Sequence, residues 1–421
     1  MRIFISLIAL FIIFPMTFAQ DISGDWAGNL KIGSQTLRLV FHLSETPDGY
    51  SATMDSPDQN ANGIIMSHVM LNGSSLTIQL LIASIRYSGE IAGDSIRGTF
   101  SQAGENFPLT LRKQENSVNN QTPEQDTGKG IFIETEVRLP INTGSLFGTM
   151  TVPDNFVSGP LALIVAGSGP TDRNGNNPSM KCDTYKKIAH ELAKNGIASL
   201  RYDKRGIAQS AAAVENEIDL RFDDYVNDVK SWIGWVRKDH RFSQIVIIGH
   251  SEGSLVGMLA SDQADKLISV SGPGRSADIL LKEQLESAPN QIKNGAYTII
   301  DSLKNGQNVK EIPQELLSLF RPSVQPYIIS WFILRPDKII KGINIPVMLI
   351  HGTTDIQVPK KDLKILAVSK PDADQLIIKN MNHVLKTATS QREANLSTYN
   401  DPSLPLSEGL IEGITLFILK K

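Results

Sequence analysis

Residues 245–253 read IVIIGHSEG, and this stretch decides the fold that the sequence predicts. Four apolar residues indicate a buried strand, and the last five have the form G-x-S-x-G at a turn that leads into a helix-compatible segment, 254–262. Such a turn forces its serine into a strained backbone conformation, and only small residues two positions to either side avoid a clash. We therefore predict that Ser251 is a nucleophile at the end of a strand.

Three further apolar runs, at residues 161–166, 197–201 and 346–350, are each followed by a turn. Continuous apolar runs are typical of strands buried on both faces, as in a parallel sheet covered by helices. Between them lie helical segments, such as 222–236, whose apolar residues recur at helical spacing. This alternation predicts an open α/β sheet, and ligands of such sheets bind at the carboxyl ends of the strands.

A serine hydroxyl needs a neighbouring base before it can act as a nucleophile. His383 has the position of that base, because it lies in a loop after the apolar run 376–378 of the last predicted strand. The other histidines lie in the N-terminal region, in or at the end of helical segments, or directly before motifs at strand ends: His42, His68, His190, His240, His250 and His351. We therefore predict that His383 is the general base.

A third residue must hold the imidazole in the correct tautomer and stabilise its charged form. Asp355 follows the strand 346–350 after a short turn, whereas Asp337, Asp362 and Asp372 do not directly follow a strand end. We predict that Asp355 orients His383; the alternative role for Asp355 is to cap a helix.

A tetrahedral intermediate also needs amide donors that face its oxyanion. One predicted donor is the backbone N–H of Glu252, directly after the nucleophile. The other is the backbone N–H of Ser168, in the Gly-rich loop 167–170. Such a loop can also hold phosphate, but it matches neither the dinucleotide nor the P-loop pattern.

The N-terminal part of the chain has a different character. Residues 1–19 combine Arg2, an apolar run and small residues before the end, which predicts a cleaved signal peptide and export to the periplasm or medium. Residues 20–114 alternate apolar and polar residues in short runs, which predicts a small antiparallel β domain. Residues 115–130 have almost no apolar residue and are predicted to be a linker.

Composition excludes several classes of protein. The formal charge of −3, with scattered Lys and Arg, does not favour nucleic-acid binding. Cys182 is the only cysteine, so an intramolecular disulfide and a cysteine-based metal site are excluded, and we expect neither cofactor nor metal. After the first apolar run, no segment is apolar and long enough to predict stable membrane insertion.

Several stretches together resemble a group of bacterial α/β-hydrolase esterases in which a small lipocalin-like β domain precedes the catalytic domain. In residues 131–421 these stretches are GSGPTDRNG at 167–175, RYDKRG at 201–206, GHSEG at 249–253, DIQVP at 355–359 and NH at 382–383. The chain order Ser251, Asp355, His383 is also that of the α/β-hydrolase fold. Weaker likenesses lie in the β domain, and the group's usual second glycine after 206 is missing, since the chain reads Ala208-Gln209-Ser210.

This resemblance implies hydrolysis of short-chain carboxylic esters through an acyl-enzyme on Ser251, with a small acyl ester as substrate. The same motifs occur in acyl-CoA thioesterases and serine aminopeptidases, which stay as alternatives together with an inactive binding protein. An insertion at about 275–340 is rich in helix formers and contains the apolar run 327–334. We expect a helical cap over the active site whose inner face receives an acyl chain; the alternative is that this run packs in the core.

Overall fold

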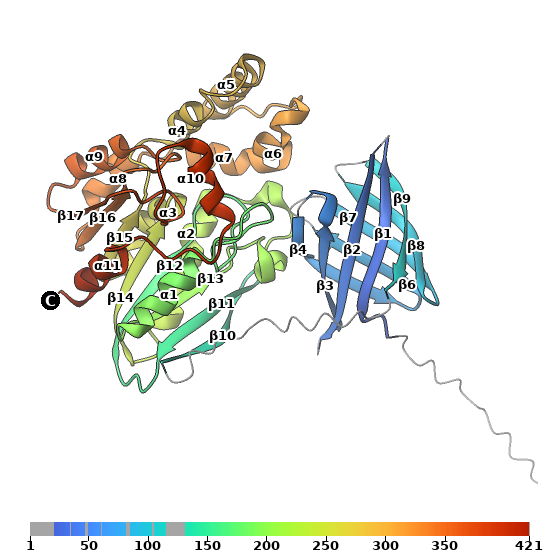
Figure 1. The fold of residues 1–421 in the computed structure, drawn as a ribbon, viewed down its shortest axis with the longest axis horizontal. Helices are drawn as coiled ribbons and strands as arrows, with labels where there is room; N and C mark the ends of the chain where they lie inside the picture. The colour runs from blue at the N-terminus through green and yellow to red at the C-terminus, as the bar shows by residue number, and fades with distance from the viewer. Residues whose placement is uncertain are drawn as a thin grey trace, which may run out of the picture.

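The computed structural model describes residues 21–33, 35–46, 49–59, 61–80, 85–102, 105–114 and 131–420 of the 421-residue chain. It contains two β-sheets, one on each side of the segment 115–130 (Figure 1). The predicted signal peptide at 1–19 and the predicted linker at 115–130 lie outside the described residues.

The first sheet has nine strands in the order β4-β3-β2-β1-β9-β8-β7-β6-β5, and neighbouring strands run antiparallel. The strands are β1 (Gly24–Ile32), β2 (Gln35–Thr46), β3 (Gly49–Ser56), β4 (Ala61–Ile65), β5 (His68–Asn72), β6 (Ser75–Leu80), β7 (Ile85–Ala92), β8 (Ser95–Gln102) and β9 (Glu105–Lys113). Figure 1 shows the sheet curved into a barrel-like shape. Alternate side chains point inward, and Trp26, Phe41, Tyr87 and Phe100 fill the interior. The predicted antiparallel β domain is confirmed.

The second sheet has eight strands in the order β10-β11-β13-β12-β14-β15-β16-β17. The strands are β10 (Phe132–Ile141), β11 (Gly144–Pro153), β12 (Gly159–Val165), β13 (Ala198–Tyr202), β14 (Phe242–His250), β15 (Lys266–Val270), β16 (Val347–Gly352) and β17 (Asp374–Ile378). The hairpin β10–β11 joins β13 antiparallel, and all pairs from β13 to β17 are parallel. The apolar runs form the central strands because both of their faces are buried.

Helices cover both faces of this sheet, which confirms the predicted α/β-hydrolase fold. The helices α1 (Thr184–Lys194) and α11 (Leu410–Leu419) pack in one apolar cluster on one face. The helices α2 (Phe222–Val236), α3 (Glu252–Ala260) and α9 (Lys360–Ser369) contribute to the larger cluster on the other face. The shorter helical segments among the described residues are η1 (Pro57–Gln59), η3 (Ala208–Ala213), η4 (Glu217–Asp219), η5 (Ser261–Gln263), η6 (Gln314–Leu316), η7 (Pro322–Val324), η8 (Ile340–Gly342), α10 (Arg392–Ser397) and η9 (Thr398–Asn400).

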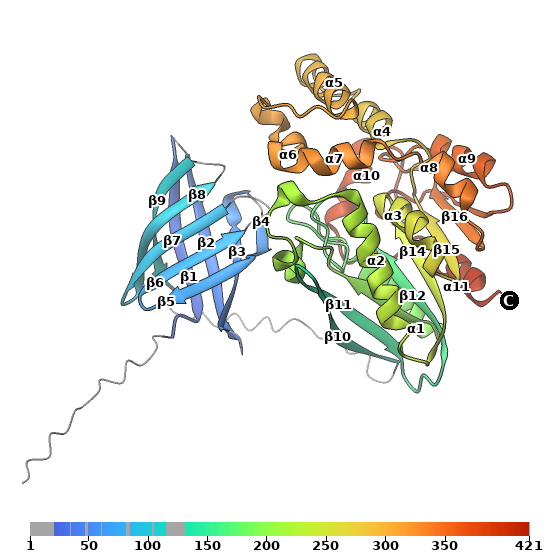
Figure 2. The same ribbon diagram turned by 180° about the vertical axis from the view of Figure 1, so that it is seen from behind.

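The insertion between β15 and β16 is helical. Its helices α4 (Ala277–Gln284), α5 (Asn290–Lys304), α6 (Leu317–Phe320) and α7 (Gln325–Phe332) stand together above one end of the sheet (Figures 1 and 2). The last helix of the insertion, α8 (Pro336–Ile339), lies beside α9. The rings of Tyr327 and Trp331 on α7 each stack on Phe222 of α2, at 6.0 Å between centroids. Ile328 and Phe332 are buried in the main core, so part of the apolar run in α7 serves core packing.

Within the part of the chain that the structure describes, no helix combines the length and the apolar character that a membrane crossing requires.

Candidate active site

Ser251 lies in the sharp turn between β14 and α3, with φ 53° and ψ −121°. This positive φ is unfavourable for a residue with a Cβ, and the turn is held because the Ser251 N–H donates to Val270 O at 2.9 Å. A Cβ on Gly249 would lie 2.3 Å from Gly253 O, and one on Gly253 would lie 2.3 Å from Val165 O. Both glycines are therefore required where the strand, the turn and β12 approach each other.

Asp355 and His383 form a buried pair at the same edge of the sheet. His383 Nδ1 lies 2.9 Å from Asp355 Oδ2, and the side chains are 6% and 0% exposed, respectively. The other carboxylate oxygen of Asp355 accepts hydrogen bonds from the N–H groups of Gln357 and Val358, both at 2.9 Å. Burial alone would raise the pKa of Asp355, but the charge and hydrogen bond of His383 and the amide of Val358 lower it to about 2. The carboxylate is therefore charged at neutral pH.

The loop of His383 is held beside the turn of Ser251 through His250. The His250 and His383 rings lie 4.8 Å apart between centroids, and His250 Nε2 lies 2.8 Å from the His383 carbonyl oxygen. Among the described residues, no hydrogen bond joins Ser251 Oγ to His383 in this structure. In free hydrolases such bonds are often formed only when substrate binds.

Burial, together with the nearby charge of His383, lowers the pKa of His250 to about 3, so its ring is neutral. Because Nε2 faces a carbonyl, which only accepts, that nitrogen carries the proton and Nδ1 accepts from Tyr185 Oη at 2.8 Å. The Tyr185 hydroxyl in turn accepts from the N–H of Gly167 at 3.0 Å. One chain of hydrogen bonds thus joins the Gly-rich loop, the end of β14 directly before Ser251 and the loop of His383.

The two predicted oxyanion donors belong to segments that meet at Ser251. Gly167 directly precedes Ser168, and a Cβ on Gly167 would lie only 3.2 Å from Ser251 Cβ. Ser168 itself is exposed. Glu252 is the first residue of α3, and its side chain is 3% exposed and lies 3.5 Å from Lys204 Nζ. Because its side chain is buried beside Lys204, the Glu252 carboxylate is not exposed to a charged group of a substrate.

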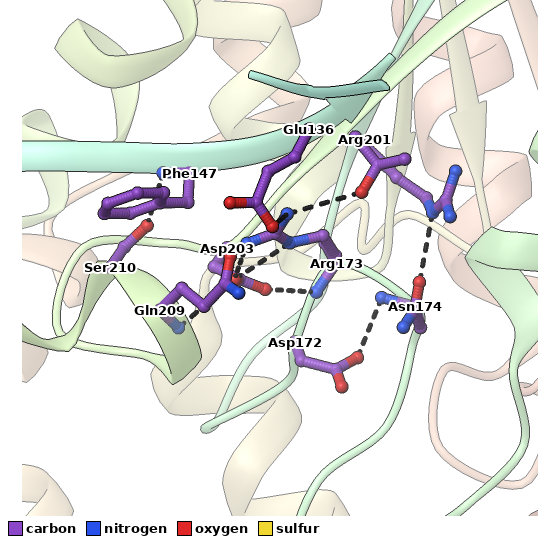
Figure 3. A network of polar contacts seen from close by, with 10 residues as sticks. Glu136, Phe147, Asp172, Arg173, Asn174, Arg201, Asp203, Gln209 and Ser210 are labelled. Carbon is purple, nitrogen blue, oxygen red and sulfur yellow. Dashed lines mark hydrogen bonds and ion pairs between the residues drawn. The ribbon is translucent and has the colours of Figure 1, made fainter. Parts of the chain in front are cut away.

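A network of polar contacts anchors the loop after β12 to the end of β13 (Figure 3). The guanidinium of Arg173 donates to Asp203 Oδ2 at 2.9 and 2.7 Å, and the Arg173 N–H donates to Asp203 Oδ1 at 2.7 Å. Both side chains of this ion pair are buried. Arg201 on β13 donates to Asn174 Oδ1 at 3.1 Å, and Gln209 also contacts Arg173. Gln209 belongs to the segment 208–210, where the resembling esterases usually have a second glycine, so this segment takes part in anchoring the loop.

Within the same loop, the Asp172 carboxylate accepts from the N–H groups of Asn174 and Asn176. Burial nevertheless raises the pKa of Asp172 to about 6.

The other candidate residues are engaged elsewhere. The rival acids Asp337, Asp362 and Asp372 pair with Arg335, Arg275 and Lys370, respectively. His190 pairs with Glu134, and His42 lies between Asp25 and Asp55. Cys182 is buried and donates to Gly175 O at 3.0 Å, consistent with a packing role. Among the described residues, no group of three or more His, Cys, Asp or Glu side chains is arranged to hold a metal.

Tyr185 and Lys204 are site residues for which the sequence analysis assigned no role, and it did not connect His250 with His383. Lys204 and His250 do carry a signal, because His250 is the last residue of a buried strand and Lys204 is the second residue after one. Tyr185 lies in the first turn of α1, and nothing in its spacing relates it to the other residues of the site.

Parts of this chain are similar to known proteins. Residues 179–285 match the family Hydrolase_4, described as serine aminopeptidase, S33. Esterase EstD of Thermotoga maritima is 28% identical over 309 residues, which cover 66% of this chain and 71% of that esterase. Among solved structures, Est1E of Butyrivibrio proteoclasticus with bound ferulic acid has a TM-score of 0.47 at 17% identity, over 68% of this chain and all of that one. The Pyrococcus furiosus esterase Pf2001 has a TM-score of 0.42 at 17% identity, over 60% of this chain and 85% of that one.

Proposed function

Because this chain is a serine hydrolase of the α/β-hydrolase fold, we propose that it hydrolyses small carboxylic esters with short acyl chains through an acyl-enzyme on Ser251. The observation that carries the proposal is the buried Asp355–His383 pair beside the strained turn of Ser251. A charged carboxylate on Nδ1 leaves His383 Nε2 as the acceptor for a proton, which is what a general base requires. The likeness to esterase EstD supports the ester as the bond that is cleaved.

In the proposed mechanism, Ser251 Oγ attacks the ester carbonyl carbon while His383 Nε2 takes the hydroxyl proton. The N–H groups of Ser168 and Glu252 stabilise the oxyanion that forms. Collapse of this intermediate breaks the bond to the alcohol, which leaves with the proton from His383. Water then attacks the acyl-enzyme by the same route in reverse, and releases the carboxylic acid.

Two features of the site bear on the substrate. Ile328 and Phe332 of α7 are buried in the core, so these two side chains are not available to receive an acyl chain. An aminopeptidase needs an accessible acid to bind the substrate amine, and Glu252, directly after Ser251, is buried beside Lys204. The burial of Glu252 favours esters over the aminopeptidase alternative, whereas a short-chain thioester would use the same groups.

The proposal is tested with purified protein on p-nitrophenyl esters of two to twelve carbons, on acyl-CoA thioesters and on aminoacyl anilides. We expect the acetate and butyrate esters to be cleaved fastest, and Ser251→Ala and His383→Gln to lose nearly all of this activity. Ser261→Ala is a matched control, because this serine lies just beyond α3 and donates only to Met258 O. His190→Gln is the control for His383, because His190 is paired with a carboxylate outside the site.

Faster cleavage of aminoacyl anilides or of thioesters would assign the alternative activity. A folded protein that cleaves nothing and does not react with a fluorophosphonate would contradict the proposal and favour a binding protein.

We also propose that the chain is exported and that its first 19 residues are removed. The N-terminal sequence of protein recovered from the periplasm or medium tests this, and an uncleaved N-terminus in the cytoplasm would contradict it.

A further inference from the structure

A buried lysine contacts both the Gly-rich loop and the residue that follows Ser251. Lys204 follows β13, and its side chain is 3% exposed. Its Nζ donates to Gly167 O at 2.6 Å, lies 3.5 Å from Glu252 Oε1 and sits 5.0 Å from the centre of the Tyr225 ring. Burying an ammonium group costs free energy unless partners compensate for it. Burial lowers the pKa of Lys204, and the charge of Glu252 partly offsets that effect.

The contact with Gly167 concerns more than one atom, because the Gly167 carbonyl and the Ser168 N–H belong to the same planar peptide unit. No cis peptide bond occurs among the described residues, so the C=O and N–H of this unit point in opposite directions. A bond that holds the oxygen therefore sets the direction of the N–H. The preceding peptide is held as well, since the Gly167 N–H donates to Tyr185 Oη at 3.0 Å.

The loop has little freedom to compensate for a rotation of this peptide. Gly167 packs so closely on Ser251 that an added Cβ would lie 3.2 Å from Ser251 Cβ. If the peptide turned over, the carbonyl oxygen of Gly167 would take the place of the Ser168 N–H. An oxygen there would repel the developing oxyanion instead of stabilising it.

We propose that Lys204 is a positioning residue of the oxyanion hole: by holding the Gly167 carbonyl it aims the Ser168 N–H at the oxyanion. Its ion pair with Glu252 links this donor to the residue that supplies the second one. Asp203, the residue before Lys204, holds Arg173 of the same loop, so the end of β13 fixes the loop at two points. This inference rests on the proposed function.

The test compares Lys204→Met with the wild type on the fastest ester. Methionine matches the length of lysine but has neither charge nor donor. We expect kcat to fall about 10- to 100-fold, less than or similar to the loss of a direct oxyanion donor, with KM changed less than about threefold. A trifluoromethyl ketone, which forms an oxyanion on Ser251, should lose affinity by the same factor as kcat/KM. The corresponding alcohol, which forms none, should bind unchanged.

Lys266→Met is the matched control, because Lys266 is also buried and donates to carbonyls, those of Phe417 and Ile418 at the C-terminal helix. It should lose thermal stability and keep kcat and ketone affinity within twofold. If Lys204→Met does not fold because Glu252 is left unpaired, the double variant Lys204→Met/Glu252→Gln removes both charges and is read in the same way.

Two results would overturn the inference while the proposed function stands, provided that the wild type is active. In the first, the folded Lys204→Met variant keeps kcat within twofold of the wild type. In the second, that variant loses kcat but keeps its affinity for the ketone. A wild type that is inert toward every ester and toward the ketone would instead refute the proposed function, and this inference with it.

Discussion

Replacing Asp355 by asparagine should remove nearly all activity while leaving the loop in place. Asp355 Oδ1 accepts from the N–H groups of Gln357 and Val358, and an asparagine oxygen can keep both bonds. Its amide nitrogen then takes the place of Oδ2, 2.9 Å from His383 Nδ1. That nitrogen only donates, so His383 must carry its proton on Nε2, the atom that has to accept the proton of Ser251.

The size of the effect follows from the same distance. A carboxylate and an imidazolium in contact at 2.9 Å, at an effective dielectric constant of about 20, attract each other by about 6 kcal/mol. The charge centres are further apart than the contact atoms, so about 4 to 5 kcal/mol is a reasonable loss in the transition state. At 1.36 kcal/mol for each factor of ten, kcat should fall about 10³- to 10⁴-fold. Because the carboxylate has a pKa of about 2, this difference should persist at every pH where the enzyme is active.

The assay is the release of p-nitrophenol from the acetate ester, with the thermal midpoint measured on the same samples. Asp362→Asn is the control, because Asp362 is equally buried but pairs with Arg275; it should lose stability and keep kcat. Asp355→Ala, which imposes no tautomer, should retain more activity than Asp355→Asn and more than His383→Gln. An Asp355→Asn enzyme within tenfold of the wild type would show that another group orients the base.

Three further predictions follow from buried groups around the site. Burial lowers the pKa of His250 from 6.5 to about 3. Between these two pH values His250 takes up a proton only when the protein unfolds, so the protein becomes less stable as the pH falls below 6.5. The free energy of unfolding should therefore fall by about 2 kcal/mol less in His250→Gln than in the wild type between pH 6.5 and 4.5, and the same fall in both proteins, measured by urea unfolding at each pH, would contradict this. Asp203→Asn leaves the buried Arg173 with only the more distant carboxylate of Glu136, 3.8 Å away, and should cost about 3 kcal/mol in urea unfolding, together with a loss of kcat; an unchanged midpoint would argue against the anchor. In Gly253→Ala the new methyl would lie 2.3 Å from Val165 O, so we expect a loss of at least about 1 to 3 kcal/mol, whereas Gly234→Ala in α2, where nothing lies within 4 Å, should be neutral or stabilising in the same calorimetric scan.

The fold was predictable from the sequence where burial leaves a simple pattern. The runs at 161–166, 245–248 and 346–350 became central strands, because strands covered on both faces must be apolar throughout. The N-terminal alternation became an antiparallel sheet for the complementary reason, since one face of each strand packs inward. The proximity of Asp355 and His383 follows from the rule that the carboxyl ends of parallel strands meet at one edge.

The contacts around the Gly-rich loop were not predictable in this way. They join Tyr185 on α1, Lys204 after β13 and His250 on β14, and no periodicity or spacing relates positions on three separate elements. The stretch 201–206 was visible as a motif. The contacts of its Asp203 with Arg173 and of its Lys204 with Gly167 depend on where the loop after β12 lies, which the sequence does not show. The role of the apolar run in α7 likewise depended on α2, against which its aromatic rings stack.

The predicted catalytic residues Ser251, Asp355 and His383 follow β14, β16 and β17, respectively, and the Gly-rich loop that starts at Gly167 follows β12. No fragment of the sheet can therefore hold a working centre, since β12, β14, β16 and β17 must all be in register first. Recovered activity during refolding should then appear with the final cooperative step, later than the helical signal. For a chain of this kind, turnover is a direct measure of how much of the population has reached the native state.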